Sequence, residues 1–182
     1  MENYTKYKLK EHDELVSLLA DKDNLFVIAC NKCFKEFETV DEPDCDEFLK
    51  LAAEQGKTVT GSAKVDFVCN KVQTERKMQD MIPEGTENVV VISCGLGVQT
   101  VAELSGKATY AAANTLNYTG HHGMALTKKS CDACAQCYLN LTGGICPIVD
   151  CSKSLVNGQC GGAKNGKCEV NPEKDCAWEK IN

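Results

Sequence analysis

Two features are missing from this sequence, and each excludes a class of protein. No apolar run is long enough to span a membrane, and the polar stretch from Met1 to Lys6 lacks the apolar core of a signal peptide. An excess of positive charge is also missing: the formal net charge is −6, whereas proteins that bind phosphate backbones have a basic surface. We therefore expect a cytoplasmic protein that spans no membrane and binds no nucleic acid.

Common catalytic motifs are missing as well. The sequence contains no Walker A motif, no Ser nucleophile elbow and no H-E-x-x-H motif. Gly95-Leu96-Gly97 follows a predicted strand, but the third glycine of a dinucleotide-binding loop is absent, so a tight strand-to-helix turn is the better interpretation. His121 and His122 lie between glycines, and adjacent residues rarely bind one metal ion. We find no residues for a flavin or a pterin, and predict no flavin cofactor and no catalysis by this chain alone.

Cysteine, in contrast, is abundant, with thirteen residues in a chain of 182. Eight of them lie in residues 131–182, which we call the last quarter of the chain although they are slightly more: Cys131, Cys134, Cys137, Cys146, Cys151, Cys160, Cys168 and Cys176. Glycines lie between them and large apolar residues are few, so this segment cannot fold by hydrophobic burial alone. Either disulfides or metal must cross-link it. Because disulfides require an oxidising compartment, a cytoplasmic protein with this pattern is predicted to bind metal.

The spacing of these cysteines favours iron–sulfur clusters over zinc. Zinc sites usually take two separated C-x-x-C pairs. Here Cys131, Cys134 and Cys137 form one C-x-x-C-x-x-C loop, which is the opening of the bacterial ferredoxin pattern, and Cys146-Pro147 adds the Cys-Pro pair that also belongs to it. Eight cysteines fill two four-cysteine sites, so we predict two [4Fe–4S] clusters, with two zinc ions as the alternative. The spacing does not assign individual cysteines to one cluster or the other.

Apolar runs and amphipathic segments alternate in the first 129 residues. The pattern predicts strands at 24–30, 57–60, 65–69, 88–93 and 108–112, and helices at 7–21, 43–54, 70–81 and 98–104. This alternation is typical of an open, mostly parallel, Rossmann-like α/β sheet. We therefore predict an α/β domain over residues 1–129 and a cysteine-rich metal-binding module over residues 130–182, with residues 114–130 as the connection.

A second group of cysteines follows the predicted strands. Cys30, Cys69 and Cys94 each lie at a strand end, where ligands bind in open α/β sheets, and Cys33 adds a fourth thiol. Four thiolates suit zinc or a further cluster. One alternative is that Cys69 and Cys94 are small buried apolar residues. Another is that Cys30 and Cys33 form a redox-active dithiol. We interpret Cys45 as a helix residue outside this group.

The sequence around the cysteines of the last quarter resembles one family. The stretches that carry the resemblance are 142–148 (Thr-Gly-Gly-Ile-Cys-Pro-Ile), 151–158, 160–162, 166–170 and 175–178 (Asp-Cys-Ala-Trp). Together they resemble the methylenetetrahydrofolate reductase C-terminal domain family. The stand-alone members of this family include the small subunit of the two-subunit reductase of acetogenic bacteria.

The resemblance implies a role and partners for the chain. It implies an accessory metal-binding subunit that passes electrons through iron–sulfur clusters to or from a flavin-containing methylenetetrahydrofolate reductase subunit. We further expect a ferredoxin- or NADH-linked electron donor. The resemblance also favours zinc at Cys30, Cys33, Cys69 and Cys94, although stretch 29–33 reads Ala-Cys-Asn-Lys-Cys where relatives often have Gly-Cys-Gly-Thr-Cys. The alternatives are a zinc-stapled structural subunit without electron transfer, a thiol redox protein, and a free-standing enzyme that acts on folate.

Overall fold

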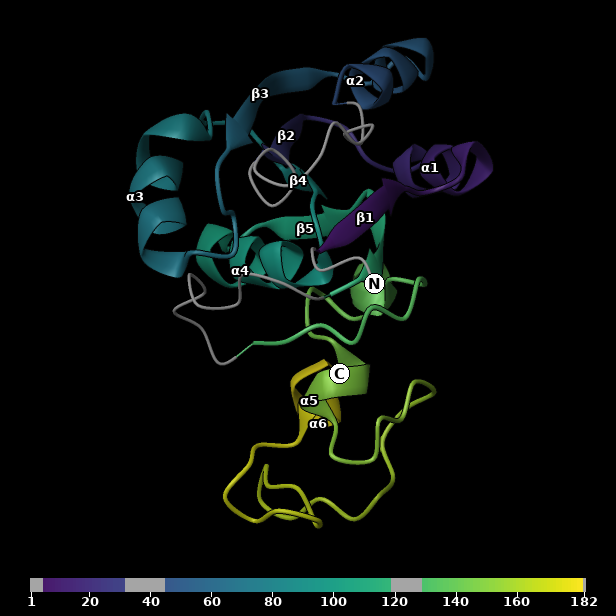
Figure 1. Ribbon diagram of the computed structural model, residues 1–182, viewed down its shortest axis with the longest axis vertical. Coiled ribbons are helices and arrows are strands. Elements are labelled where there is room, and N and C mark those ends of the chain that lie inside the picture. The colour runs from purple at the N-terminus through teal and green to yellow at the C-terminus, as the bar shows by residue number, and fades with distance from the viewer. Residues whose placement is uncertain (1–4, 32–44, 119–128, 182) are drawn as a thin grey trace.

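The computed structural model describes residues 5–31, 45–118 and 129–181. Within these residues, the main sheet has four parallel strands in the order β3–β2–β4–β5 (Figure 1). The strands are β2 (Leu25–Cys30), β3 (Val59–Val65), β4 (Asn88–Ile92) and β5 (Ala108–Ala111). The helices that connect and flank them are α1 (His12–Leu19), α2 (Cys45–Glu54), α3 (Lys71–Met81) and α4 (Gly95–Ser105). The predicted parallel α/β sheet is thereby confirmed.

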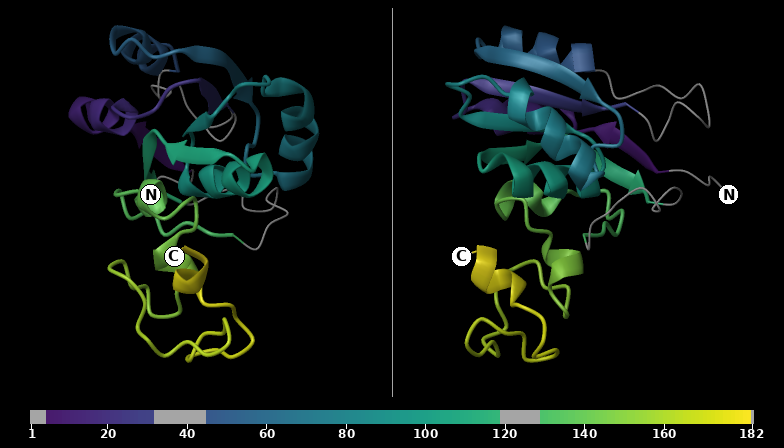
Figure 2. Two further views of the ribbon diagram at one scale, coloured as in Figure 1. Left: turned by 180° about the vertical axis from the view of Figure 1, so that it is seen from behind. Right: turned by 90° about the vertical axis from the view of Figure 1, so that its left-hand side faces the viewer.

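Helices cover both faces of the main sheet (Figure 2), which explains the unbroken apolar runs of β2 and β4. On one face, Leu25 and Val27 of β2 pack with side chains of α1 and α2. On the other face, Phe26 and Ile28 pack with side chains of α3 and α4. Because successive side chains of a strand point to opposite faces, β2 contributes to both cores.

The order of the strands creates a natural ligand position. The chain runs from β2 outward to β3 and then crosses to β4 on the other side of β2. The carboxyl ends of β2 and β4 therefore lie where the strand order reverses, which is the usual binding position in such sheets. Cys30 ends β2, and Ser93 and Cys94 follow β4 at the same edge.

An antiparallel pair of strands, which the sequence analysis did not predict, completes this part of the chain. β1 (Lys6–Leu9) pairs with β6 (Ala113–Asn117), and β6 follows β5 with only Ala112 between them. The predicted helix at 7–21 is therefore too long. Tyr7 is buried in β1 and its Oη donates a hydrogen bond to the carbonyl oxygen of Cys30, so α1 begins only at His12. The predicted connection from residue 114 is likewise a strand as far as Asn117.

Two other predicted boundaries are corrected by the structure. In place of short strands at 57–60 and 65–69, the chain forms one edge strand, β3, and then a turn in which Phe67 has a φ of 50°. The middle of β3 carries small and polar residues at the sheet edge, so the hydrophobic pattern is interrupted there. Helix α4 begins at Gly95 rather than Val98, because the two glycines of its first turn fit where larger side chains would collide with neighbours.

The start of the cysteine-rich segment packs on the α/β domain. Leu139, in the 3₁₀ helix η2 (Tyr138–Leu141), is buried in the core that α4 covers. The side chain of Asn140 accepts a hydrogen bond from the backbone N–H of Ala111 (2.6 Å) and donates one to its carbonyl oxygen (3.0 Å). These contacts cross the predicted boundary after residue 129, and the division into two domains stays a prediction.

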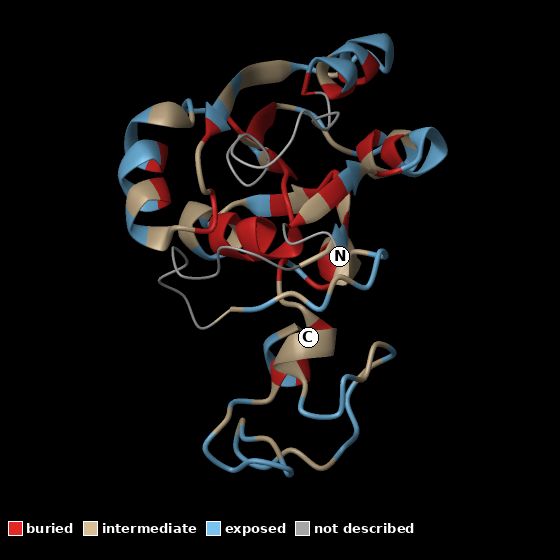
Figure 3. Cartoon of the chain, in the orientation of Figure 1, coloured by how far each residue is buried: buried red, intermediate tan, exposed pale blue. Residues whose placement is uncertain are grey.

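Beyond Cys146 the chain extends away from the α/β domain (Figure 1). The short helices α5 (Pro147–Asp150) and α6 (Ala177–Ile181) contact each other, and loops connect them. Among the described residues from 151 onward, only Ala177 and Trp178 are buried (Figure 3). This agrees with the expectation that hydrophobic burial alone does not fold the segment. In the part of the chain that the structure describes, no helix combines the length and apolar character needed to cross a membrane.

Adding one methyl group at Gly144 should test how the cysteine-rich segment packs on α4. Gly143 and Gly144 both have positive φ, but only a side chain at Gly144 would overlap Ala102 of α4. Gly144→Ala should lower the free energy of unfolding by roughly 1–3 kcal/mol more than Gly143→Ala, because overpacking adds to the shared backbone strain. Urea unfolding of both variants measures the difference. Equal destabilisation by the two substitutions would contradict the docking contact.

Candidate metal centres

The eight cysteines of the last quarter separate into two pockets of four. Cys131, Cys134, Cys137 and Cys146 line the first, which we call the proximal pocket because side chains of α4 and β6 also form its wall. Cys151, Cys160, Cys168 and Cys176 line the second, which we call the distal pocket. The two pockets enclose about 360 and 350 Å³ of space between atoms, part of it open to solvent. The structure thus answers the question that spacing left open, namely which cysteines lie together.

Hydrogen bonds to α4 and β6 hold the cysteine loop of the proximal pocket. The side chain of Gln99 is buried and donates from Nε2 to the carbonyl oxygen of Ser130 (2.7 Å), directly before Cys131. Thr115 accepts the backbone N–H of Ala135 at its carbonyl oxygen (3.0 Å). Asn114 accepts the N–H of Cys137 at Oδ1 (3.0 Å). Three points along the C-x-x-C-x-x-C loop are therefore fixed to regular secondary structure.

Backbone conformation allows this loop to present three thiols to one pocket. Ala133 and Ala135 have positive φ angles of 49° and 56°, which side-chain-bearing residues rarely adopt. Gly95, the first residue of α4, makes room for the loop, because a Cβ at this position would lie 3.0 Å from the Sγ of Cys131. The Cys94-Gly95 turn was predicted from the sequence as a tight strand-to-helix turn, and close approach to Cys131 is the reason for its glycine.

The distal pocket is formed by loops and by the two short helices. Backbone hydrogen bonds join Cys168 N–H to the carbonyl oxygen of Lys174 (2.9 Å) and Cys176 N–H to that of Gly166 (2.8 Å). Trp178, the one tryptophan of the sequence, lines the pocket and donates from Nε1 to the carbonyl oxygen of Leu155 (2.9 Å). Few apolar contacts and several loop hydrogen bonds therefore hold this pocket together.

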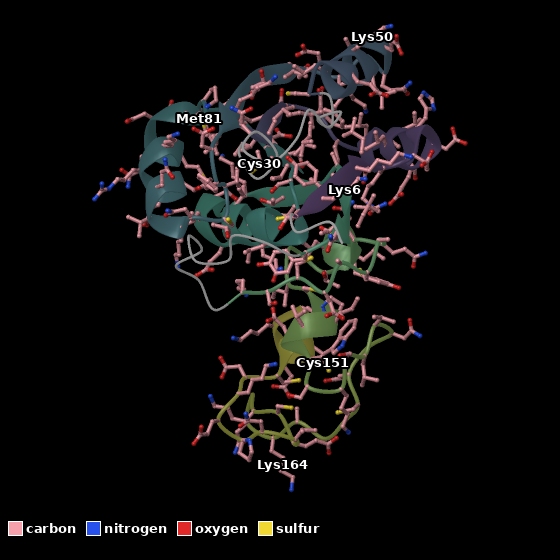
Figure 4. All side chains as sticks on the ribbon, viewed as in Figure 1. Lys6, Cys30, Lys50, Met81, Cys151 and Lys164 are labelled. Carbon is pink, nitrogen blue, oxygen red and sulfur yellow. The ribbon has the colours of Figure 1, made fainter. Side chains whose placement is uncertain are left out.

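Helix α5 is the link between the two pockets. Cys146 of the proximal pocket is its N-cap residue, and Cys151 of the distal pocket is its C-cap residue. At 1.5 Å per residue, five helical steps place the two Cα atoms roughly 8 Å apart. Figure 4 shows Cys151 next to this helix, with Lys164 at the far end of the distal loops, whereas Cys30 lies in the α/β domain.

The cysteines at the carboxyl edge of the sheet form a third group. Cys69 and Cys94 are buried and Cys30 is partly buried. Cys69 and Cys94 belong to one buried cluster, and Cys30 packs against it. Burial, and then the nearby thiols of Cys94 and Cys30, raise the pKa of Cys69 to about 12. Cys69 lies in the turn after β3 rather than in a strand. The fourth predicted member, Cys33, lies outside the described residues, as do His121 and His122.

Thiol ionisation differs between the two pockets. Burial raises the pKa of Cys137 to about 12 and also raises the pKa of Cys146. In the distal pocket, a hydrogen bond with the Ser152 hydroxyl lowers the pKa of Cys168 from its ordinary value. Because metals bind the thiolate form, a cation bound in the proximal pocket must displace protons that burial strongly retains.

Within the described ranges, no three or more His, Cys, Asp or Glu side chains converge closely enough to hold a single metal ion. Two residues of the proximal pocket wall, Gln99 and Thr115, were not predicted as site residues. Gln99 belongs to a Cys-Gly-x-Gly-x-Gln stretch that was visible in the sequence, whereas Thr115 lay in the presumed connection and gave no signal.

Comparison with known proteins identifies the part of the chain that holds both pockets. Residues 110–182 match the model of a family described as methylene-tetrahydrofolate reductase C terminal. The matched range begins in β5 and contains all eight cysteines of the proximal and distal pockets. This match confirms the resemblance drawn from the sequence for this part of the chain. Comparisons with curated proteins and with solved structures gave no match.

Alkylation should distinguish the thiols of the two pockets in the reduced, metal-free protein. At pH 8, iodoacetamide should modify Cys168 faster than Cys137, because a lowered pKa gives a larger thiolate fraction. The rate at Cys137 should rise about tenfold per pH unit up to pH 11, whereas the rate at Cys168 should level off first. Peptide mass spectrometry measures both rates.

Denaturant provides the control for this experiment, because in the unfolded chain both thiols ionise near pH 8.5 and should react at similar rates.

The raised pKa of Cys137 also predicts that the stability of the fold depends on pH. The unfolded chain loses the Cys137 proton near pH 8.5 and the folded chain only near 12, so the metal-free fold should lose stability as pH rises between these values. Faster labelling of Cys137 than of Cys168 in the folded protein would contradict the raised pKa of Cys137 and the lowered pKa of Cys168.

Proposed function

We propose that this protein is the accessory, metal-binding subunit of a methylenetetrahydrofolate reductase. In this proposal it holds two [4Fe–4S] clusters and passes electrons to or from the flavin of a partner subunit, in one-carbon folate metabolism. The observation that carries the proposal is the separation of eight cysteines into two pockets of four, inside the range that matches the reductase family. The family description supports the proposed reaction, and the four cysteines in each pocket support the proposed cofactor class.

The residues present fit iron–sulfur clusters. Iron–sulfur clusters of the [4Fe–4S] type are held by four cysteine thiolates, and each pocket contains four cysteines. The four cysteines of a cluster each bind a different iron, so their sulfur atoms surround a body larger than one ion. The three-cysteine loop from Cys131 to Cys137 supports a cluster over a zinc ion, because zinc sites usually take their cysteines as two separated C-x-x-C pairs.

When bound, such clusters supply one-electron transfer, and the chain's own residues determine where that occurs. Cys146 and Cys151, at the two ends of α5, hold the pockets close together. Each pocket has one exposed cysteine, Cys134 or Cys160, but buried residues of α4, β6 and η2 form the wall of the proximal pocket, whereas most residues that line the distal pocket are exposed or partly exposed. Burial and exposure affect reduction potential, so the two pockets favour different potentials. The exposed distal pocket suits contact with a ferredoxin- or NADH-linked electron donor.

The third group of cysteines is proposed to bind zinc. Cys30, Cys69 and Cys94 lie near one another, but not all at ligand distance from one point, at the edge of the sheet where ligands usually bind, and Cys33 would complete a four-thiolate set. This site is separate from the proposed electron path, because its cysteines are not among those that line either cluster pocket. Its role in the proposal is to stabilise the α/β domain.

The distribution of charge supports a protein partner for the α/β domain. Residues 129–182 contain six Lys and six Asp or Glu, so the formal net charge of −6 belongs to the preceding residues. An acidic domain favours contact with basic patches on a partner protein. In the proposal that partner is the flavin-containing reductase subunit, and this chain, which has no flavin of its own, is inactive without it.

Metal analysis tests the cluster assignment directly. Protein purified without oxygen should bind about eight iron atoms with matching sulfide. Cys134→Ser and Cys160→Ser should each remove about half of this iron, because the two residues line different pockets. Trp178 lines the distal pocket, so its fluorescence should be quenched by an iron–sulfur cluster there and should recover in Cys160→Ser but not in Cys134→Ser. A colourless protein that contains only zinc after anaerobic reconstitution would refute the proposal.

Co-expression with a flavin-containing reductase subunit tests the electron path. The pair should reduce methylenetetrahydrofolate with the physiological donor and with an artificial dye. The double variant Cys160→Ser/Cys168→Ser should lose donor-driven activity to near background and keep dye-driven activity of the flavin subunit. Val170→Ala, an exposed change in the same loops, is the matched control and should retain both activities. Folate reduction by the isolated chain, or full donor-driven activity of the double variant, would contradict the accessory role.

A further inference from the structure

Thr115 occupies a central position in the wall of the proximal pocket. It lies in β6, is only 4% exposed, and lines the pocket together with Cys131, Cys134, Cys137 and Cys146. Its carbonyl oxygen holds the middle of the cysteine loop through the Ala135 N–H. Its side chain therefore faces a pocket that its own backbone helps to shape.

The hydroxyl of Thr115 and the sulfur of Cys131 face the same small space. Thr115 Oγ1 accepts the backbone N–H of Gly95 (2.8 Å) at the start of α4. The position where a Gly95 side chain would begin lies 3.8 Å from Thr115 Oγ1 and 3.0 Å from Cys131 Sγ. The glycine thus leaves the space between hydroxyl and thiol clear.

The hydrogen of this hydroxyl is available for a donor bond. A threonine hydroxyl donates one hydrogen bond and accepts up to two, and the bond from Gly95 uses only its acceptor capacity. Other buried threonines donate to backbone carbonyls: Thr74 to Val68 and Thr100 to Leu96. Among the hydrogen bonds of the described residues, none has the Thr115 hydroxyl as its donor. Because buried polar groups are nearly always satisfied, a bond partner is expected inside the pocket.

We propose that Thr115 donates its O–H to a sulfur atom of the iron–sulfur cluster held in the proximal pocket, and thereby raises the reduction potential of that cluster. The inference rests on the proposed function, since it requires a cluster at Cys131, Cys134, Cys137 and Cys146. Reduction adds negative charge to the cluster and its sulfur atoms. A hydrogen bond to sulfur stabilises that charge more in the reduced form, which raises the potential.

Redox titration followed by EPR tests the proposal. The proximal signal is the one lost in Cys134→Ser. Thr115→Val keeps the shape of the side chain and removes the hydroxyl, so it should shift the potential of the proximal cluster to a more negative value. Thr115→Ser keeps the hydroxyl and should restore the wild-type potential. The control is Thr100→Val, which removes a buried hydroxyl whose bond stays within α4, and it should leave the potential unchanged. The distal cluster should keep its potential in all three variants.

A second measurement separates the donor bond from a structural role, because Thr115→Val also leaves the Gly95 N–H without its acceptor. Pulsed ENDOR of the reduced proximal cluster should detect a coupled proton that exchanges in D₂O, present in wild type and Thr115→Ser and lost in Thr115→Val. Wild-type protein that binds iron in this pocket without such a proton, or an unchanged potential in Thr115→Val, would overturn the inference alone. Absence of iron from the pocket would overturn the proposed function and this inference with it.

Discussion

The attachment of the cysteine loop to α4 and β6 is the constraint on which the proximal pocket depends. The loop has little apolar surface, and two of its alanines adopt strained positive φ angles. One hydrogen bond donated by Gln99 and two accepted by Thr115 and Asn114 hold it in this conformation. These three residues lie on elements with their own buried core, so the stability of the α/β domain supports the geometry of the pocket. Backbone strain of this kind persists only where surrounding structure fixes it.

The distal pocket depends on a different source of stability. Only Ala177 and Trp178 are buried among the described residues from 151 onward, so the loops that bear its cysteines lack a hydrophobic core of useful size. In such segments, the free energy of metal binding is folding free energy. Under the proposed function, the α/β domain shapes the proximal pocket before a cluster binds, whereas the cluster itself supplies most of the order of the distal pocket.

Much of the fold was predictable from sequence because β2 and β4 are continuous apolar runs, which buried parallel strands require. The ribbon of β1 and β6 was not predictable in the same way. Each strand is short, and the partners are more than a hundred residues apart, so no local pattern connects Leu9 with Ala113. The hydrophobic pattern of β3 was also hard to read, but for a local reason. An edge strand does not need large apolar side chains, and the middle of β3 has none.

The cysteine ligands were predictable because a dense cysteine pattern has few explanations, but their grouping was not. Spacing along the chain does not say which loop folds back on which, and Cys146 and Cys151 are close in sequence yet line different pockets. Thr115 could not be predicted at all. Its importance comes from its position next to Gly95 and Cys131 in the fold, and a threonine in a polar stretch of sequence matches no recognisable motif.

Helix α5 also affects how the two pockets assemble. A helix of four residues is not stable by itself, because the free energy lost in ordering its first turn exceeds the free energy gained from the hydrogen bonds of one turn. Its two ends must therefore be held from outside, by Cys146 on one side and Cys151 on the other. When one of these cysteines is fixed, the chain that carries the other is already restricted. Fixing the second cysteine then costs less conformational entropy. Filling of the two pockets is thus a coupled process, in which the first to be occupied prepares the second.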